Sequence, residues 1–580
     1  MRKILKKLVP ICSIAGSLAL YSGHARAIDF DVGNVHASWD TQITAGTAIR
    51  TENPSCSLTG DPNAGGDSGS CGRSANTAQW ANGQNGNLNY RAGQPYAGYL
   101  KGTTELLLTN SDGYKFMGRG TGFYDFAAAN TDYTPLSESA KKWAVDNWQL
   151  LDLWGSKDYD IGGEHGHVRV GNQVINWGES LFAQGGINAT NALDIQRLLI
   201  PGTQLKEAVL PSPMVSFAQD IARGLSAEAY YQFGWNRDFF PPVGTFWSIT
   251  NNFGKGALPI LLNPNNFNLA GLGPNAYAVP QGHDELANQQ GQFGVNFHYK
   301  PPHTELDLGV YFENYHDKTP NLLDLADGAT AWKYLENRQL YGISANFPLG
   351  DWAIGAESSY RPKDAVSLTG CFGPGGPLDA NTNGIGGVNC QQWQDMQKFQ
   401  TDVVGLLAMT PSDYPVLNYI KADTGTLTVE GTWIYYPGVS ANGLVTRTMD
   451  GVPVVQGYQS GLYAWQQYNS ALGYTVQGTQ GTANSAGLVI DYNVVYDGSI
   501  IPGWQVNPGV TFSAGLYGYT PNFYANYEQG TKSVNFYCYF NQNPAVWQAG
   551  VNFTHFFGGG PIANPYMDRD NVGLFVTRNF

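Results

Sequence analysis

The sequence predicts an all-β fold, a transmembrane antiparallel β-barrel of about 18 strands, with 16 as the alternative count. Three observations lead to this prediction. The chain begins with an export signal, its long segments alternate apolar and polar residues with period two, and only 13% of its 580 residues are charged. Ordinary soluble domains contain roughly 25% charged residues. A barrel fits this combination because its strands face lipid on one side and water on the other.

Residues 1–27 form a predicted signal peptide. Basic residues precede the apolar run "ICSIAGSLAL", which is shorter than the roughly 20 residues that a helix needs to span a bilayer. Ala25 and Ala27 provide the small residues that a signal peptidase reads, so we expect cleavage after Ala27. Residues 28–580 would then form a single outer-membrane β-barrel domain.

Cleavage would also make the chain more acidic. It removes five of the 32 basic residues and none of the 46 acidic ones, so the net charge changes from −14 to −19. A chain of this charge is a poor partner for nucleic acid, which binds basic surfaces.

Alternation marks the individual strands. The segments "VHASWDTQITAGTAIR" (35–50), "GQFGVNFHYK" (291–300) and "TELDLGVYFENY" (304–315) each place apolar residues on one face and polar residues on the other. Short links and long excursions follow each other along the chain. Because bacterial barrels keep short turns in the periplasm, we expect the long excursions to be extracellular loops. The long excursions lie near 51–98, 176–210, 237–289, 362–398 and 437–486.

The last predicted strand, "DNVGLFVTRNF", ends on Phe580. Phe580 shares its strand face with Val572, Leu574 and Val576. This pattern resembles the signal that bacterial barrel-assembly machinery reads in a final strand. We therefore expect that machinery as a partner and the outer membrane of a Gram-negative bacterium, with its lipid and lipopolysaccharide, as the location.

Cysteine positions predict two local disulfides. Cys56 and Cys71 bracket one Gly/Asn-rich segment, and Cys371 and Cys390 bracket another. Both segments are expected outside the cell, where disulfides persist. Spacing alone does not decide the connectivity, so other pairings remain open. Cys538 is expected to be a free thiol that faces lipid.

The segment before Cys390 contains a partial calcium-loop pattern. Asp379, Asn381 and Asn383 match its first half, but Cys390 replaces the bidentate Glu of the twelfth position. The sequence favours a solvated turn over a calcium site there. No G-x-S-x-G, H-E-x-x-H or C-x-x-C motif is present. We therefore predict no enzymatic activity and no bound cofactor.

The stretch "HVRVGNQVINWGESLFAQGGIN" (167–188), followed by "LLIPGTQLKEAVLPSPMV" (198–215), resembles a family signature. The family is the proteobacterial outer-membrane β-barrel family "domain of unknown function thirteen hundred and two". Further matching pieces are "YFENYHDKTP", "AESSYRP" and "MDRDNVGLFVTRNF", so the resemblance covers about residues 35 to 580. It implies an outer-membrane barrel. It also implies genetic association with a periplasmic protein and an inner-membrane transporter of the lipid-exporting type, which become expected partners.

The resemblance also implies a function. The gene clusters of the family serve steroids, terpenes, esters or other hydrophobic carbon sources, which favours a channel for hydrophobic or amphipathic small molecules, including fatty-acid-like ones. The alternative is a structural component of an envelope-spanning export or lipid-handling assembly. A general porin is the third hypothesis.

The segment near 177–211 is too irregular for strands and too apolar for a plain loop. We expect it to fold into the lumen as a constriction. Packing over the barrel mouth or against a neighbouring protomer is the alternative. The side chains expected to line the constriction and the lumen are Trp177, Glu179, Asn188, Asp194 and Arg197 of the segment, with Arg169, Glu305, Asp307, Glu313, Glu357 and Arg361 of the strands.

The outer loop 240–273 is similarly apolar. We expect Phe246, Trp247, Phe253 and Phe267 to form a capture loop for an apolar solute. In the alternative, this loop only caps the barrel.

Overall fold

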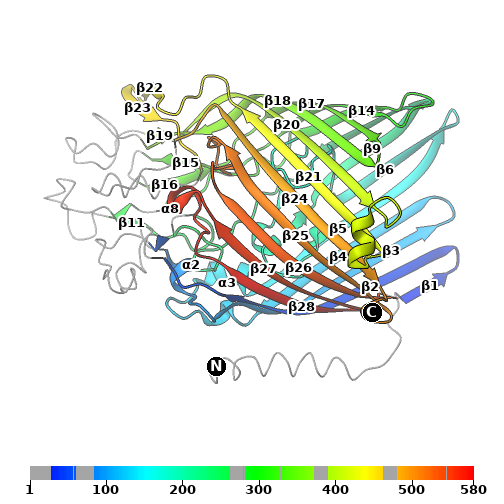
Figure 1. Ribbon diagram of the computed structural model, residues 1–580. Helices are drawn as coiled ribbons and strands as arrows, with labels where there is room; N and C mark the ends of the chain where they lie inside the picture. Colours follow the sequence, from blue (N-terminus) through cyan, green and yellow to red (C-terminus); the bar gives the residue numbers. More distant parts are fainter. Residues whose placement is uncertain are drawn as a thin grey trace.

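The chain closes into a cylinder of antiparallel strands in a computed structural model (Figure 1). The main sheet has 19 strands, and β1 (Ile28–Val32) pairs only with residues 35–39 at one end of the barrel, which leaves 18 strands in the wall. β2 (Val35–Arg50) closes the barrel, because it pairs with β3 (Pro95–Asn110) on one side and with β28 (Asn571–Asn579) on the other. The structure describes residues 28–55, 58–59, 84–251, 253–261, 278–279, 281–325, 329–370, 389–461, 480–543 and 545–580.

The predicted count of 18 is therefore correct, and the alternative of 16 is wrong. Every wall strand pairs with its two neighbours in antiparallel register. The other wall strands are β4 (Tyr114–Asp125), β5 (Asp146–Ile161), β6 (Glu164–Gln173), β9 (Ser212–Ala222), β10 (Leu225–Gln232), β13 (Gln292–Tyr299), β14 (Asp307–Tyr315), β17 (Arg338–Leu349), β18 (Trp352–Ser367), β20 (Trp393–Met409), β21 (Thr424–Tyr435), β24 (Asn484–Asp497), β25 (Trp504–Tyr517), β26 (Lys532–Gln542) and β27 (Trp547–Phe557).

Alternation along the strands gives the barrel an apolar exterior. In β5, Trp148 is 78% exposed and Leu150 is 62% exposed, whereas the polar residues that alternate with them, Asn147 and Gln149, point inward. A large apolar surface of this kind is stable only against lipid, and a closed barrel leaves no unpaired strand edge there. The even number of antiparallel strands is the one that bacterial single-chain outer-membrane barrels have. The protein therefore lies in the outer membrane of a Gram-negative bacterium.

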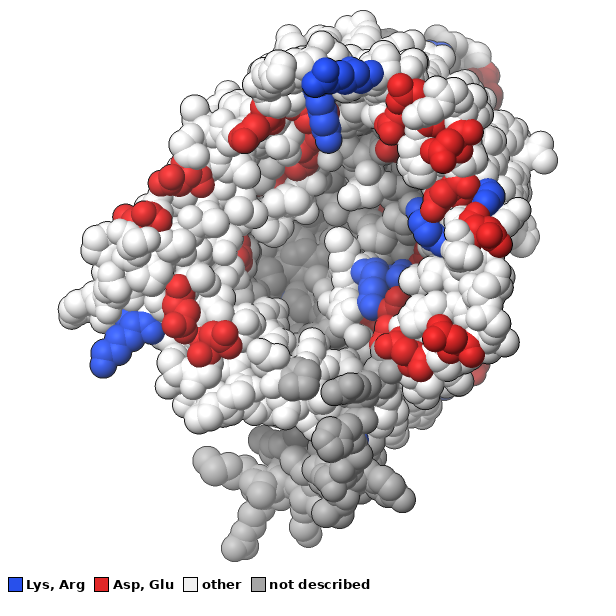
Figure 2. Space-filling view, turned by 90° about the vertical axis from the view of Figure 1, so that its right-hand side faces the viewer, with Lys and Arg blue, Asp and Glu red and all other residues white. Residues whose placement is uncertain are grey.

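The two ends of the barrel differ, as the sequence predicts. At one end the strands are joined by short turns and by the small helix α6 (Pro415–Ile420), and the long loops lie at the other end. Figure 2 views the short-turn end and shows a hollow opening whose rim carries more acidic than basic side chains. Glu305 belongs to this rim, in the turn before β14, and is exposed.

The last residue of the chain completes the closure. The backbone N–H of Phe580 donates to the carbonyl oxygen of Thr41 at 2.8 Å, and the N–H of Thr41 donates to the carbonyl oxygen of Phe580 at 3.2 Å. The guanidinium of Arg578 lies 4.8 Å from the ring centroid of Phe580 and 5.2 Å from that of Trp547. These rings shield the charge of Arg578, since an aromatic face attracts a cation.

The outer loops contain short elements of their own. Among the described residues, no helix is long and apolar enough to cross a bilayer. The elements are α2 (Asn85–Leu88), η3 (Ala128–Asn130), α3 (Glu138–Ala144), β11 (Ile260–Leu261), β12 (Ala278–Val279), β15 (Asn321–Asp324), β16 (Thr330–Lys333), β19 (Cys390–Gln391), β22 (Leu444–Met449), β23 (Val452–Gly457) and α8 (Gly560–Ala563).

The structure describes two of the cysteines, whereas several other predicted positions lie outside the described residues and stay predictions. Cys538, on the lipid-facing side of β26 with the exposed Phe536, is a free cysteine. Cys390 is buried in β19, but its expected partner is not among the described residues. The undescribed positions are residues 1–27 with Ala25 and Ala27, Cys56, Cys71, Phe267, Cys371, Asp379, Asn381 and Asn383.

Candidate functional site

Residues 174–211, called the inward segment below, cross the interior of the barrel. They include β7 (Ala192–Leu193), α4 (Ile195–Leu198), α5 (Leu205–Ala208) and β8 (Val209–Leu210). The segment bonds to β3 through Glu207 and to β18 through the backbone of Glu179. β3 and β18 are nine positions apart in the ring of 18 strands, so they form opposite walls. The predicted inward fold is confirmed, and a position over the mouth is excluded.

One lumenal carboxylate holds the first turn of the inward segment. Glu357 lies near the middle of β18 and accepts hydrogen bonds from the backbone N–H groups of Glu179 at 2.5 Å, Ser180 at 3.1 Å and Ile187 at 2.8 Å. Only a carboxylate offers enough lone pairs for three such donors. Its charge strengthens each bond.

A second carboxylate, Glu430 of β21, holds the next residues in the same way. It accepts from the N–H groups of Leu181 at 3.0 Å, Phe182 at 2.7 Å and Ala183 at 3.0 Å. Both carboxylates are almost completely buried under the segment. They replace the water that this irregular backbone would otherwise need.

Glycines allow the backbone to approach Glu357 this closely. Gly178 has φ of +92°, and a Cβ added there would lie 2.5 Å from a carboxylate oxygen of Glu357. A Cβ on Gly186 would lie 2.1 Å from the other oxygen. A side chain at either position would therefore displace the segment from its anchor.

The opposite wall holds the second half of the segment through ion pairs. Glu207 accepts from the ammonium of Lys101 and the hydroxyl of Thr103, both on β3. Lys206 pairs with Glu105, which Arg119 also contacts at 2.9 Å. Buried pairs that are broken on one side cost several kcal/mol. The segment is thus attached on both sides of the lumen.

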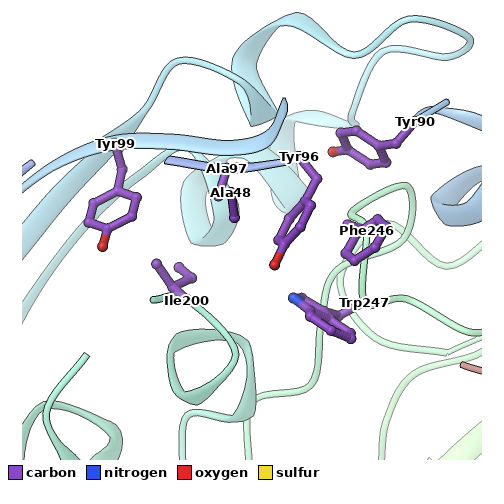
Figure 3. Packing of buried hydrophobic residues seen from close by; sticks show 8 residues of the cluster. All are labelled: Ala48, Tyr90, Tyr96, Ala97, Tyr99, Ile200, Phe246 and Trp247. Carbon is purple, nitrogen blue, oxygen red and sulfur yellow. The ribbon is translucent and has the colours of Figure 1, made fainter. Parts of the chain in front are cut away.

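An aromatic cluster fixes the same wall to the outer loops (Figure 3). Tyr96 of β3 stacks on Phe246 with 3.9 Å between ring centroids, and Tyr90 meets Phe246 edge-on at 5.8 Å. Trp247 and Ile200 pack into the same cluster. Because Ile200 comes from the inward segment and Phe246 from the loop after β10, the cluster joins three parts of the chain.

A cavity of about 520 Å³, called the lumenal cavity below, opens beside the inward segment. Three apolar side chains of the segment face it from exposed positions, with Leu181 60%, Phe182 43% and Leu205 66% exposed. Charged side chains of both signs complete the lining. These are Arg119, Lys206, Lys318, Arg361 and Lys398, with Asp152, Asp238, Asp317 and Asp364.

The charged part of this lining includes residues of the outer loops. Asp238 accepts a hydrogen bond from the hydroxyl of Tyr524, and burial raises the pKa of Asp238 to about 6. Burial raises the pKa of Asp317 to about 7, although Arg338 lies 3.4 Å away. Burial lowers the pKa of Lys318 to about 8. Burial thus shifts the pKa values of all three groups toward neutral pH.

The eleven residues predicted for the constriction and the lumen occupy three kinds of place in the structure. Of the eleven predicted residues, only Asn188 and Arg361 line the lumenal cavity. Buried residues between the segment and the wall are Trp177, Asp194, Arg197, Glu313 and Glu357. These residues form hydrogen bonds and ion pairs within the protein, because a segment that crosses the lumen needs partners for its polar groups and the carboxylates and guanidiniums of the inner wall provide them.

Individual hydrogen bonds and ion pairs show how these buried residues are held. The indole N–H of Trp177 donates to Glu228 at 2.8 Å, and Glu313 accepts from Thr190 at 2.7 Å. Asp194 caps α4 and pairs with Arg197 at 3.3 Å.

Four predicted residues lie elsewhere along the lumen side. Glu179 accepts from Asn346 at 2.8 Å. Arg169 lies 4.4 Å above the ring of Trp154. Asp307 begins β14 at the short-turn end. Glu305 is part of the rim and does not reach the constriction.

A second cavity of about 310 Å³, called the outer cavity, lies among the loops. Trp247 and Phe253 of the predicted capture loop line it. Phe246 does not, because it is 1% exposed and packed between Tyr90 and Tyr96. The prediction of a capture surface is therefore wrong for Phe246, whose ring stabilises the loop.

Sequence reasoning missed the residues that meet over long separations. Alternation along β21 places Glu430 on the inner face, but Leu181 is 249 positions away. Asp238 and Tyr524 are 286 positions apart. Among the residues that the structure describes, no group of three or more His, Cys, Asp or Glu side chains is placed to hold a metal ion.

Comparison with solved structures finds proteins of low identity. OccAB1 of Acinetobacter baumannii is 11% identical, with 97% of this chain and 99% of that chain covered and a TM-score of 0.41. OccK1 (OpdK) of Pseudomonas aeruginosa is 9% identical, with 94% and 98% covered and a TM-score of 0.40. No curated protein matches the sequence.

One family model, described as a protein of unknown function (DUF1302), matches residues 8–580. The match extends over nearly the whole chain, including the inward segment and the terminal strand. The chain therefore belongs to the DUF1302 family.

Proposed function

We propose that the protein is an outer-membrane channel for hydrophobic or amphipathic small molecules of the steroid-, terpene-, ester- or fatty-acid-like classes. The observation that carries the proposal is the apolar surface inside the barrel. Leu181, Phe182 and Leu205 of the inward segment are exposed to the lumen, where a pore for hydrophilic solutes would carry polar groups. An apolar solute that covers them gains roughly 25 cal/mol for each Å² removed from water.

The charged side of the lumenal cavity supports the amphipathic part of the proposal. Arg361 and Lys398 border the same cavity as Leu181 and Phe182. A molecule with an apolar body and one polar end would contact both kinds of surface at once. Ligand sites commonly combine a mainly apolar wall with a few such polar groups.

A deletion strain tests the proposal. We expect slower growth on an apolar carbon source and unchanged growth on succinate, with the wild-type gene restoring the difference. Equal growth on both would contradict it. A second measurement separates a general porin, because free entry of sugars into proteoliposomes would show an open hydrophilic pore.

A structural role in an envelope assembly predicts a different result. In that case a periplasmic partner would co-purify with the barrel, and the deletion would impair growth on both carbon sources.

A further inference from the structure

The outer cavity has the lining of a small-molecule site. Its volume of about 310 Å³ lies at the lower end of ligand pockets, which hold roughly 300–1,000 Å³. Phe240, Phe253 and Phe523 surround it with ring centroids 5.0 to 5.2 Å apart. Trp247 and Tyr566 add two further rings. Among the described residues of the lining, Glu528 is the one charged side chain, and it is itself buried.

Within the part of the chain that the structure describes, one turn borders both this cavity and the lumenal cavity. Residues 522–526, called the partition turn, lie between β25 and β26. Phe523, Tyr524 and Asn526 line both cavities. A molecule that moves directly from one cavity to the other must therefore displace these side chains.

The partition turn is held by contacts to both compartments. The hydroxyl of Tyr524 donates to Asp238 of the outer loop, and the amide of Asn526 donates to the carbonyl oxygen of Gln184 in the inward segment at 3.3 Å. Within the turn, the amide of Asn522 donates to Asn526 at 2.8 Å. The turn thus depends on a few polar contacts at each end.

The backbone of the turn is also strained. Ala525 has φ of +47°, in the left-handed region that residues with a Cβ rarely adopt. Its N–H donates to the carbonyl oxygen of Asn522 at 3.1 Å, which holds this conformation. Strain at a site of this kind is maintained by the surrounding contacts and is released when they break.

We propose that the outer cavity is a binding site for an uncharged, mainly apolar ring molecule, and that the partition turn is the gate between this cavity and the lumenal cavity. This inference rests on the proposed channel function and adds the site, the ligand class and the path. The rings favour an apolar ligand by burial. An anionic ligand is disfavoured, because it would lose water beside the carboxylate of Glu528 and find no opposite charge among the described lining residues.

Cysteine protection tests the binding site without relying on transport. In a Cys538→Ser background, Ile249→Cys or Thr531→Cys places a thiol on the wall of the outer cavity, and Ser139→Cys places a matched thiol on the exposed surface of α3. N-phenylmaleimide, which is neutral and aromatic, is expected to label all three variants. Excess naphthalene should slow labelling of the two cavity thiols at least tenfold and leave Ser139→Cys unchanged, whereas naphthalene-2-sulfonate should protect none of them.

The proposed binding site would be refuted if naphthalene protected all three thiols equally or protected none of them. It would also be refuted if the barrel folded and neither cavity thiol reacted with N-phenylmaleimide. Two reporters keep the test valid if one variant fails to fold.

The role of the partition turn as a gate is tested by uptake of 1-N-phenylnaphthylamine, a neutral apolar fluorophore, into whole cells. The initial rate is expected to rise severalfold for Tyr524→Phe, which loses the bond to Asp238 but keeps the ring. Phe523→Trp should lower the rate, because the larger ring fills the passage.

Unchanged uptake rates in both variants would refute the role of the partition turn as a gate. If wild-type cells take up the fluorophore but naphthalene does not protect the cavity thiols, the binding site is refuted and the proposed channel function is not. Absence of uptake by wild-type cells would remove the proposed function itself.

Discussion

Replacing the two carboxylates that hold the inward segment should open the lumen. Glu357 and Glu430 each accept three backbone hydrogen bonds from the segment. In the variant Glu357→Gln/Glu430→Gln, each side chain keeps one acceptor oxygen and turns an N–H₂ group toward N–H donors. The volume of the side chains stays nearly the same, so the wall itself should fold.

The expected magnitude follows from the lost bonds. A hydrogen bond to a charged group contributes about 1.5–3 kcal/mol net. Losing one such bond at each carboxylate weakens the closed position of the segment by roughly 3–6 kcal/mol, which is about a hundredfold to ten-thousandfold in the equilibrium between closed and open positions.

Single-channel recording in planar bilayers measures this change. The double variant is expected to show a larger mean conductance and frequent transitions between levels. Glu305→Gln is the control for the substitution itself, since it removes one carboxylate charge from the exposed rim and should keep the wild-type conductance. A double variant with a folded barrel and wild-type conductance would refute the anchoring role of the two carboxylates.

Three further results are expected. Because the raised pKa of Asp238, about 6, exceeds its unfolded value of 3.8, its contribution to stability is full below pH 3.8 and is lost as pH rises through 6. Urea unfolding in micelles should therefore show that the free energy of unfolding of the wild-type protein rises from pH 7 to pH 5 and that it rises less in Asp238→Asn. An equal rise in both proteins would contradict this. Arg50→Met should lower the free energy of unfolding by about 3–5 kcal/mol, because it removes the 3.1 Å ion pair of the buried Asp568, whose other cationic contact, Arg569, is 4.0 Å away. The exposed Arg91→Met should have little effect in the same urea titration, and equal losses would contradict the assignment. Deletion of Phe580 should reduce the heat-modifiable, membrane-inserted fraction, Phe580→Trp should retain it, and unchanged insertion of the deletion would count against the terminal signal.

The strand pattern could be predicted from the sequence because it is a local property. The alternation in residues 35–50 coincides with β2. The irregular, apolar composition of residues 177–211 also indicated burial, and a lumen was the available place for it. Phe580 could be assigned to the final strand for the same local reason.

The lining of the lumen could not be predicted, because alternation tells which face a residue occupies and not what covers it. Glu313 and Glu305 both appear as lumenal carboxylates by parity. In the structure Glu313 is covered by Thr190 of the inward segment, whereas Glu305 lies in an exposed turn. Phe246 and Phe253 belong to one apolar loop, yet of the two only Phe253 lines the outer cavity. Such differences depend on contacts between distant parts of the chain.

Uptake of a neutral apolar solute through an intact lipopolysaccharide leaflet tests the central claim most directly. The charged, tightly packed leaflet slows the entry of apolar molecules, so entry through the protein can be measured against it. Cells that produce the protein are expected to take up 1-N-phenylnaphthylamine faster than cells that lack it, with no increase in the entry of sugars. Equal uptake of the fluorophore by both kinds of cell, at equal levels of folded barrel in the membrane, would contradict a channel for apolar molecules.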